Sequence, residues 1–132
     1  MAKIFRANDI RGLYLSEINK ALAFKVGEAL ANIFADGIVV IAHDARRGAK
    51  VLTEALVEGF QRGWKEQRKI HALKIIGLAT TPMFYFFVNR FKASGGVMVT
   101  ASHNPPEYNG FKIVKEGAVV LSPAIIKESI RN

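Results

Sequence analysis

The stretch that decides the fold runs from Gly96 to Lys115 and reads G-V-M-V-T-A-S-H-N-P-P-E-Y-N-G-F-K-I-V-K. It begins with Gly96–Thr100, a short apolar run that is typical of a buried strand. It ends with a second strand candidate, Phe111–Lys115. The segment between them holds two prolines, which stiffen the backbone and remove hydrogen-bond donors, and Asn109-Gly110, a strong turn signal. The stretch therefore predicts a rigid loop that joins two strands.

Strand and helix patterns alternate along the rest of the chain. Helices are predicted over 18–33, 51–60, 83–91 and from Pro123 to Asn132, and strands are predicted over 38–42 and 71–76. Ser16 is the predicted N-cap of the first helix, and Pro82 opens the third at a position that tolerates its missing N–H. This alternation predicts an α/β, three-layer domain with a mixed, mostly parallel sheet between helices. No linker or repeat divides residues 1–132, so a single domain is expected.

The composition excludes several classes of protein. The chain has no cysteine, which rules out a disulfide framework, a thiolate metal site and a cysteine nucleophile. No apolar run reaches the roughly 18 residues that a membrane-spanning helix needs. The N-terminus also lacks the long apolar stretch of a signal peptide. We therefore expect a cytoplasmic protein without a membrane partner.

The net charge of +8 admits three explanations, namely bound nucleic acid, attraction of a phosphorylated small molecule, or a solvated surface. Nucleic-acid modules place stacking aromatics among basic residues. Here the aromatics lie in apolar runs such as Phe84–Phe87, so no nucleic-acid partner is expected. That aromatic run fits either the core or an interface with a further domain or another copy.

The loop after Thr100 carries one candidate nucleophile, Ser102. It follows a strand at the carboxyl end, where α/β sheets bind their ligands, and a rigid loop holds a hydroxyl in one place. A serine becomes a useful nucleophile only beside a base or a cation, and His103 and Lys112 are the nearest such groups in sequence. Taken alone, S-H-N-P also fits an ordinary turn with a solvated serine.

Four segments occur in the order found in the α-D-phosphohexomutase superfamily. Residues 100–114 resemble its phosphoserine loop, in the variant of the bacterial phosphomannomutase/phosphoglucomutase group. The glucosamine-phosphate branch usually departs at these positions. Residues 5–12, F-R-A-N-D-I-R-G, resemble its F-R-x-Y-D-I-R-G, residues 43–46 its G-R-D-x-R, and residues 80–83 its P-T-P helix start. The resemblance covers nearly all of the chain and implies the N-terminal domain of a longer enzyme.

The resemblance implies an intramolecular phosphotransferase, an isomerase of carbohydrate metabolism. In this family the loop serine, here Ser102, is phosphorylated and binds Mg²⁺ through its phosphate. It exchanges the phosphoryl group with the 1- and 6-positions of a hexose phosphate, glucose or mannose, through a 1,6-bisphosphate that also acts as activator. Lys112 matches a lysine that assists proton transfer, and Arg11 an arginine close to the phosphoserine; both are also expected to touch substrate. His103 either orients the loop or takes part in catalysis, and Arg46 is expected to pair with Asp44.

Two positions depart from the family pattern. Asn8 stands where a tyrosine near the substrate is usual, which puts the expected sugar contact of this residue in doubt. Arg47-Gly48-Ala49 stands where a serine usually follows D-x-R, which changes the capping of the second helix.

The D-G-D-G-D motif that supplies the family's magnesium carboxylates is absent from these residues. The remaining domains of a full-length enzyme are therefore expected partners, and the isolated chain is expected to be inactive. Apolar area left uncovered predicts self-association through the helix at 83–91 or at 124–130. The alternative is a noncatalytic phosphosugar-binding or regulatory module that kept the loop.

Overall fold

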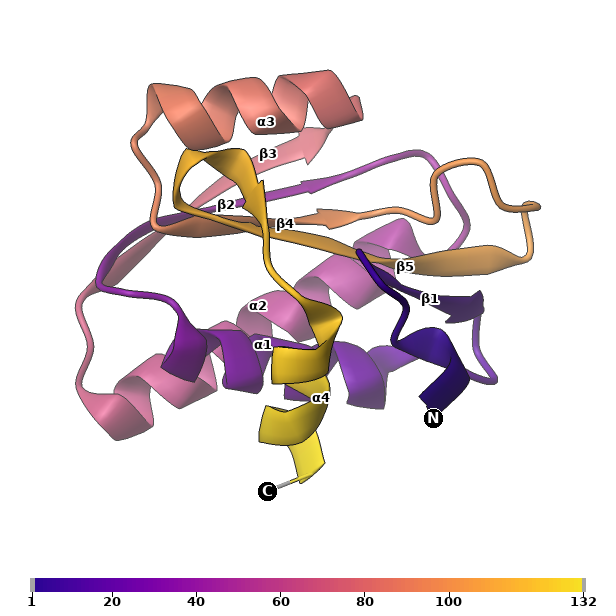
Figure 1. The fold of residues 1–132 in the computed structure, drawn as a ribbon, viewed down its shortest axis with the longest axis horizontal. Helices are drawn as coiled ribbons and strands as arrows, with labels where there is room; N and C mark the ends of the chain where they lie inside the picture. The colour runs from indigo at the N-terminus through magenta and orange to yellow at the C-terminus, as the bar shows by residue number, and fades with distance from the viewer. Residues whose placement is uncertain (1, 132) are drawn as a thin grey trace.

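The computed structural model describes residues 2–131, so Met1 and Asn132, the ends of the predicted domain, lie outside the described residues. One mixed sheet lies between helices on both faces, which confirms the predicted three-layer α/β class (Figure 1). Its strands are β1 (Ile10–Leu13), β2 (Gly37–His43), β3 (His71–Leu78), β4 (Gly95–Val99), β5 (Tyr108–Lys115) and β6 (Val119–Val120). The helices are α1 (Lys20–Ile33), α2 (Ala49–Gln67), α3 (Thr81–Arg90) and α4 (Pro123–Arg131), with 3-10 turns η1 (Ala2–Ile4) and η2 (Glu116–Ala118).

The strand order is β1-β5-β4-β2-β3, with β6 paired to β5. Strand β2 pairs parallel with β3 and β4, whereas β5 pairs antiparallel with β1, β4 and β6. Parallel pairing is thus a smaller share of the sheet than the sequence pattern predicted. The reason is the connection between β4 and β5, which holds no helix. A parallel pair needs a crossover of a dozen or more residues, while a short loop returns the chain antiparallel.

The helix starts follow local capping chemistry. Helix α1 begins after Asn19, whose side-chain oxygen accepts a hydrogen bond from the Leu22 N–H at 3.0 Å, so the prediction of Ser16 as its cap is wrong. Asparagine supplies the same acceptor closer to the first turn. Helix α2 begins after Gly48, which has a φ of +82° and no side-chain cap. A Cβ atom at this position would overlap the Tyr14 ring, and the positive φ also favours glycine.

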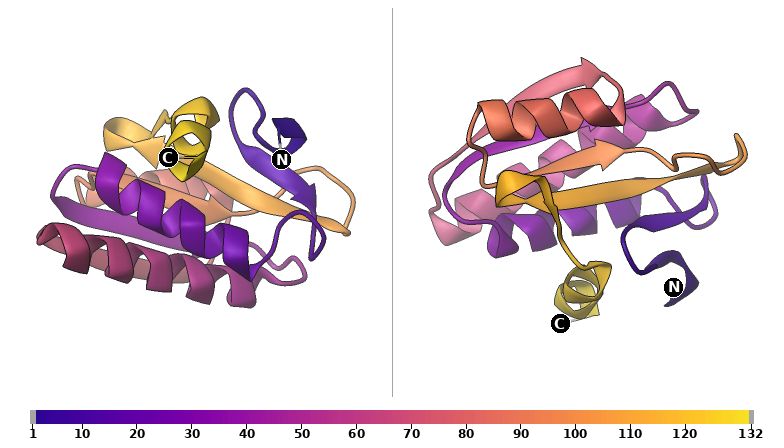
Figure 2. Two further views of the ribbon diagram at one scale, coloured as in Figure 1. Left: turned by 90° about the horizontal axis from the view of Figure 1, so that it is seen from below. Right: turned by 45° about the horizontal axis from the view of Figure 1, so that its top comes forward.

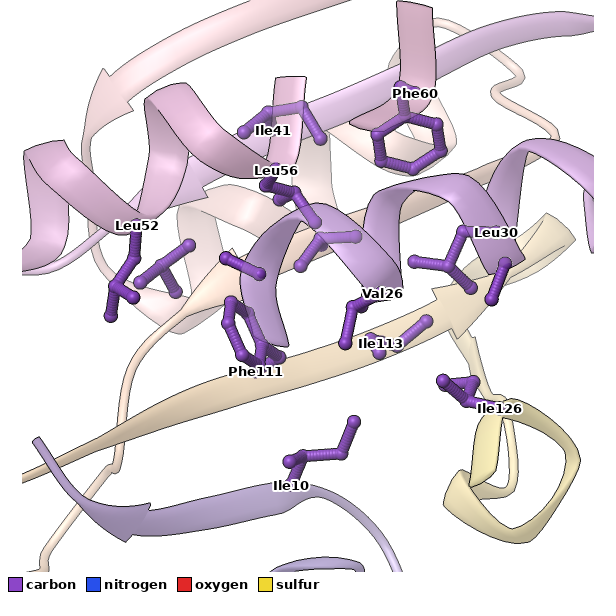
Figure 3. Packing of buried hydrophobic residues seen from close by; sticks show 14 of the residues in the cluster. Ile10, Val26, Leu30, Ile41, Leu52, Leu56, Phe60, Phe111, Ile113 and Ile126 are labelled. Carbon is purple, nitrogen blue, oxygen red and sulfur yellow. The ribbon is translucent and has the colours of Figure 1, made fainter. Parts of the chain in front are cut away.

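Two hydrophobic clusters hold the layers together. The larger one lies between the sheet and helices α1, α2 and α4, and Figure 3 shows its central side chains: Ile10, Val26, Leu30, Ile41, Leu52, Leu56, Phe60, Phe111, Ile113 and Ile126. The smaller cluster lies under α3 and contains Phe84, Val88 and Met98. Alternate residues of the central strands face opposite clusters, so the direction of every side chain on β5 is fixed.

Helices α1 and α2 pack at very close range through small residues. A Cβ atom added to Gly59 would overlap the Phe24 carbonyl oxygen, and one added to Gly27 would overlap the Leu56 carbonyl oxygen. Because both obstacles are helix backbone, a methyl group at either position forces the helices apart.

We expect Gly59→Ala to lower the free energy of unfolding by about 3 kcal/mol, despite the higher helix propensity of alanine. Lys65→Ala on the exposed side of α2 is the control and should change it by no more than about 0.5 kcal/mol. Denaturant unfolding of the purified chain measures both. Equal stability of the Gly59→Ala variant and the parent chain would contradict the close packing.

His71, at the start of β3, predicts a loss of stability in acid. Its side chain is fully covered and stacks on Trp64 with ring centroids 4.3 Å apart. Burial lowers the pKa of His71 below its usual 6.5, and Asp36, 3.7 Å away, opposes this only in part. Because the folded pKa is lowered, the unfolded chain takes up this proton first. The contribution to stability is therefore present above about pH 6.5 and is lost as pH falls below that value.

The corresponding measurement is the free energy of unfolding at about pH 7.5 and about pH 5. We expect a smaller acid-induced loss in His71→Phe than in the parent chain, because phenylalanine keeps the stacking and carries no titrating group. The carboxylates are common to both proteins, so the difference between them isolates His71. An identical pH dependence would show that His71 titrates as a solvated histidine.

The two helices expected to expose apolar area are covered by their own domain only in part. Helix α3 buries Phe84 and Val88 but leaves Phe86 59% exposed, and α4 buries Ile126 but leaves Ile125 48% exposed. Association of copies through either helix stays a prediction. Among the described residues, no helix is both long and apolar enough to cross a membrane.

Candidate functional site

Two connections meet at the carboxyl ends of β2 and β4. These strands are parallel neighbours, so the β2–α2 connection (44–48) and the β4–β5 loop (100–107) leave the sheet at the same end. Both lie beyond the strands in Figure 1, and the second view of Figure 2 shows the loop projecting from the sheet. Backbone bonds join the base of the loop to its surroundings: Asp44 N–H donates to the Val99 carbonyl at 3.1 Å, and Thr100 N–H donates to Gly110 at 2.9 Å.

Ser102 lies in this loop, half-buried, with a φ of +53°. This left-handed conformation costs a residue with a Cβ atom about 1–2 kcal/mol, so the surrounding structure must hold it in place. The backbone N–H of Ser102 donates to Thr100 Oγ1 at 2.9 Å. Its carbonyl oxygen accepts from Arg46 Nη2 at 2.6 Å. Both backbone polar groups of the candidate nucleophile are thus engaged.

Arg11 reaches the same loop from β1. The strand runs antiparallel to β5, with Arg11 opposite Gly110. The Arg11 guanidinium donates to Asn104 Oδ1 at 2.5 Å and forms an ion pair with Asp9, to which its Nε donates at 2.9 Å. The sequence predicted that Arg11 lies close to Ser102, but it did not identify Asp9 and Asn104 as the partners of the guanidinium.

Lys112 lies on the same face of the sheet as Arg11. Its neighbours Phe111 and Ile113 point into the larger cluster, so Lys112 points to the opposite side. Ile10 also points into that cluster, which directs Arg11 to the side of Lys112. No hydrogen bond or ion pair joins the Lys112 side chain to another residue of the 2–131 range. Its amine is therefore uncommitted on the face where Arg11 meets the loop.

The other two predicted site residues are exposed. His103 follows Ser102 at the surface of the loop, and Asn8 lies just before β1. Neither side chain makes a hydrogen bond to another residue within the described part of the chain. The structure therefore brings Ser102 and Arg11 together through one loop, directs Lys112 to that face, and assigns no contact to His103 or Asn8.

Four residues that were not predicted to belong to the site hold the loop in place. Asp44 and Arg46 come from the β2–α2 connection, and Arg46 Nε lies 3.5 Å from the Asp44 carboxylate, as expected. Thr100 donates its hydroxyl to Asp44 Oδ2 at 2.5 Å. Asn109, fully buried, donates to the Arg47 carbonyl at 2.9 Å. Each of these residues lies within a segment that resembles the family, and this resemblance is the signal by which they could have been found.

Two carboxylates of the site, those of Asp9 and Asp44, are paired with arginines. Asp9 pairs with Arg11 and Asp44 with Arg46, and the described residues contain no group of three His, Asp or Glu side chains that could hold a metal. Hard Mg²⁺ prefers several oxygen ligands, carboxylates among them. These residues therefore do not form a magnesium site by themselves. An open hollow of about 490 Å³ adjoins the loop and is lined by Asp44, Ala45, Arg46, Arg47, Asn104, Pro106 and Glu107.

Residues 2–132 match the family model described as phosphoglucomutase/phosphomannomutase, alpha/beta/alpha domain I. The chain belongs to this family, and it corresponds to the first domain. The family predicted from the sequence is therefore confirmed.

Relatives and solved structures agree with this assignment. A protein of Xanthomonas campestris described as "Phosphohexose mutases" is 45% identical over 118 residues, which is 89% of this chain and 25% of that protein. A probable phosphoglucosamine mutase of Thermococcus gammatolerans is 37% identical over 93% of this chain and 26% of its own length. A phosphoglucomutase/phosphomannomutase family protein of Burkholderia thailandensis has a TM-score of 0.83 at 28% identity, over 99% of this chain and 30% of that chain.

The chain thus spans about a quarter of the length of the curated relatives that it matches. A phosphomannomutase of Methanocaldococcus jannaschii is also similar, at 36% identity over 91% of this chain. Relatives with three different substrate descriptions therefore match at comparable identity. Sequence identity to these relatives therefore does not identify which hexose phosphate is the substrate.

Proposed function

We propose that this chain is the phosphoryl-carrying domain of a phosphohexose mutase, with Ser102 as the carrier. The observation that supports it most is the convergence of Ser102 and Arg11 on one rigid loop at the carboxyl end of a parallel strand pair. Phosphoryl transfer requires mainly positioning and cations around the shared charge. A serine on a fixed loop with a guanidinium beside it meets both requirements.

In the proposed reaction, the bond between phosphorus and Ser102 Oγ breaks while a bond forms from phosphorus to a hydroxyl oxygen of the hexose monophosphate. The sugar hydroxyl loses its proton as this happens, and the reverse transfer returns the other phosphate to Ser102 Oγ. Lys112 is the proposed group that passes this proton from the sugar hydroxyl to Ser102 Oγ, because its amine is uncommitted on the face where Arg11 meets the loop. Arg11 is a fork-shaped donor suited to phosphate oxygens. His103 is proposed either to orient the loop or to take part in catalysis, and Asn8 is the proposed sugar contact.

Mg²⁺ is the proposed cofactor, with the phosphate on Ser102 as the one ligand from this chain. The absence of a carboxylate cluster in the described residues means that further ligands would come from another domain. The bound ion would neutralise phosphate charge. A glucose or mannose 1,6-bisphosphate is the proposed activator, since it loads Ser102.

The proposed partners are a hexose phosphate, glucose or mannose, and the remaining domains of a longer enzyme. We propose a cytoplasmic location without nucleic-acid or membrane partners, in keeping with the substrate. Association of copies through α3 or α4 is proposed for the isolated domain, where Phe86 and Ile125 are exposed.

A noncatalytic phosphosugar-binding module is the second candidate, favoured by the exposure of His103 and by the incomplete metal site. We expect the purified 132-residue chain to show no mutase turnover with glucose or mannose 1-phosphate, even with Mg²⁺ and bisphosphate. The longer protein should turn over under the same conditions. Sustained turnover by the isolated chain would overturn the shared-site proposal, and a longer protein that binds the sugar phosphate without turnover would favour the module.

A further inference from the structure

The polar contacts around Ser102 form a closed ring through three side chains. The Ser102 N–H donates to the Thr100 hydroxyl oxygen at 2.9 Å, and that hydroxyl donates to Asp44 Oδ2 at 2.5 Å. Asp44 in turn lies 3.5 Å from Arg46 Nε, and Arg46 returns to the Ser102 carbonyl at 2.6 Å. The ring starts and ends on the backbone of the residue that carries the positive φ.

Arg46 also holds the rest of the loop. Its Nη2 donates to the Asn104 carbonyl at 2.6 Å, and its Nη1 donates to the carbonyls of Pro105 at 2.8 Å and Tyr108 at 3.2 Å. The Arg46 guanidinium therefore donates hydrogen bonds to four backbone carbonyl oxygens, including that of Ser102. Lysine could not do this, because it is a single point charge on a flexible stem.

Two further hydrogen bonds fix the orientation of Asp44. Its Oδ1 accepts a hydrogen bond from the Arg46 backbone N–H at 3.0 Å, and its own N–H is bound to Val99 on β4. The ring is thereby anchored to the sheet rather than to other parts of the loop. Arg46 is only 14% exposed at its side chain, and Asp44 27%, so water competes weakly for these bonds.

We propose that Arg46, Asp44 and Thr100 are positioning residues that hold Ser102 in its left-handed conformation and so fix the direction of its Cα–Cβ bond. This inference rests on the proposed role of Ser102 and adds residues that act through it. The strain of a positive φ at serine would otherwise be relieved by rotation of the loop. With the ring closed, the Cα–Cβ bond of Ser102 points in one direction before any substrate arrives. Oγ is then confined to the positions that rotation about this bond allows, which favours transfer in a fixed geometry.

The test compares Thr100→Ser with Thr100→Val in the 132-residue chain, together with Arg46→Lys. Thr100→Ser keeps the hydroxyl, Thr100→Val keeps the shape without it, and Arg46→Lys keeps the charge without the fork. The readout is hydrogen exchange, by NMR, of the loop amides that are bonded within the loop: Ser102, Asn104 and Tyr108. We expect roughly tenfold faster exchange of the Ser102 amide in Thr100→Val, the effect of one lost hydrogen bond. All three loop amides should exchange faster in Arg46→Lys, and Thr100→Ser should match the parent chain.

The amide of Met98 on β4 is the internal reference, and its exchange should not change in the Thr100 variants. Unchanged exchange of the Ser102 amide in Thr100→Val would overturn the ring, and so would equal effects of Thr100→Ser and Thr100→Val. If Arg46→Lys fails to fold, the pair of Thr100 variants still decides the question.

A second readout addresses catalysis in the longer protein. Thr100→Val should lower kcat by about tenfold with little change in KM, and Thr100→Ser should restore it. A change confined to KM would contradict a positioning role. Turnover retained by Ser102→Ala would defeat the proposed function but leave the exchange result intact, so the two failures are distinguishable.

Discussion

Replacement of Ser102 by alanine in the longer protein is expected to lower mutase turnover by about 10³-fold or more, because the phosphoryl carrier is lost. Alanine keeps the Cβ atom and the backbone hydrogen bonds of residue 102, so the loop should retain its shape. The measurement is turnover of glucose and mannose 1-phosphate with Mg²⁺ and bisphosphate present.

Ser16→Ala is the matched control, since Ser16 is exposed and lies outside the loop. Its turnover should equal that of the parent protein. The free energy of unfolding should stay within about 0.5 kcal/mol in both variants. A Ser102→Ala protein with a normal rate would end the phosphoserine hypothesis.

Arg11→Met is expected to have the second largest effect, a loss of about 10³-fold in turnover. The Arg11 guanidinium donates a hydrogen bond to Asn104 in the loop of Ser102. The charge of a transferring phosphate would develop next to this loop. Arg11→Lys restores a point charge without the two-pronged geometry, so it should recover part of the rate and not all of it.

Arg62→Met serves as the control, because Arg62 is exposed and pairs with Glu66 on α2, away from the loop. Removal of a positive charge there should leave turnover unchanged. Equal rates for the Arg11→Met and Arg62→Met proteins would show that Arg11 holds Asp9 and the loop without assisting transfer.

Much of the fold could be predicted because periodicity reports which faces are buried. The predicted strands over 38–42 and 71–76 and the predicted helix over 51–60 lie within observed elements, and the predicted helix over 83–91 extends one residue beyond the end of α3. Strand β1 was missed, since Ile10–Leu13 has only four residues and contains a glycine and an arginine. It forms through antiparallel pairing with β5, a contact distant in sequence that no local pattern encodes.

The candidate site was predicted in part. The position of Ser102 in a loop, and that of Arg11 near the same loop, could be predicted because the motifs that contain them resemble segments that act on one phosphate. The role of Arg46 could not be predicted, because its partners are backbone carbonyls, which are the same in every residue type. The positive φ of Ser102 was equally hidden, because tertiary contacts rather than residue type impose it.

The central claim is that Ser102 carries the phosphoryl group, and phosphosite mapping tests it most directly. The longer protein is incubated with glucose or mannose 1,6-bisphosphate, freed of sugar, digested, and analysed by mass spectrometry, with the Ser102→Ala protein treated in parallel. We predict phosphate on Ser102 that is transferred to added hexose monophosphate and is absent from the variant. Turnover accompanied by phosphate on a different residue, or by none on the protein, would contradict it.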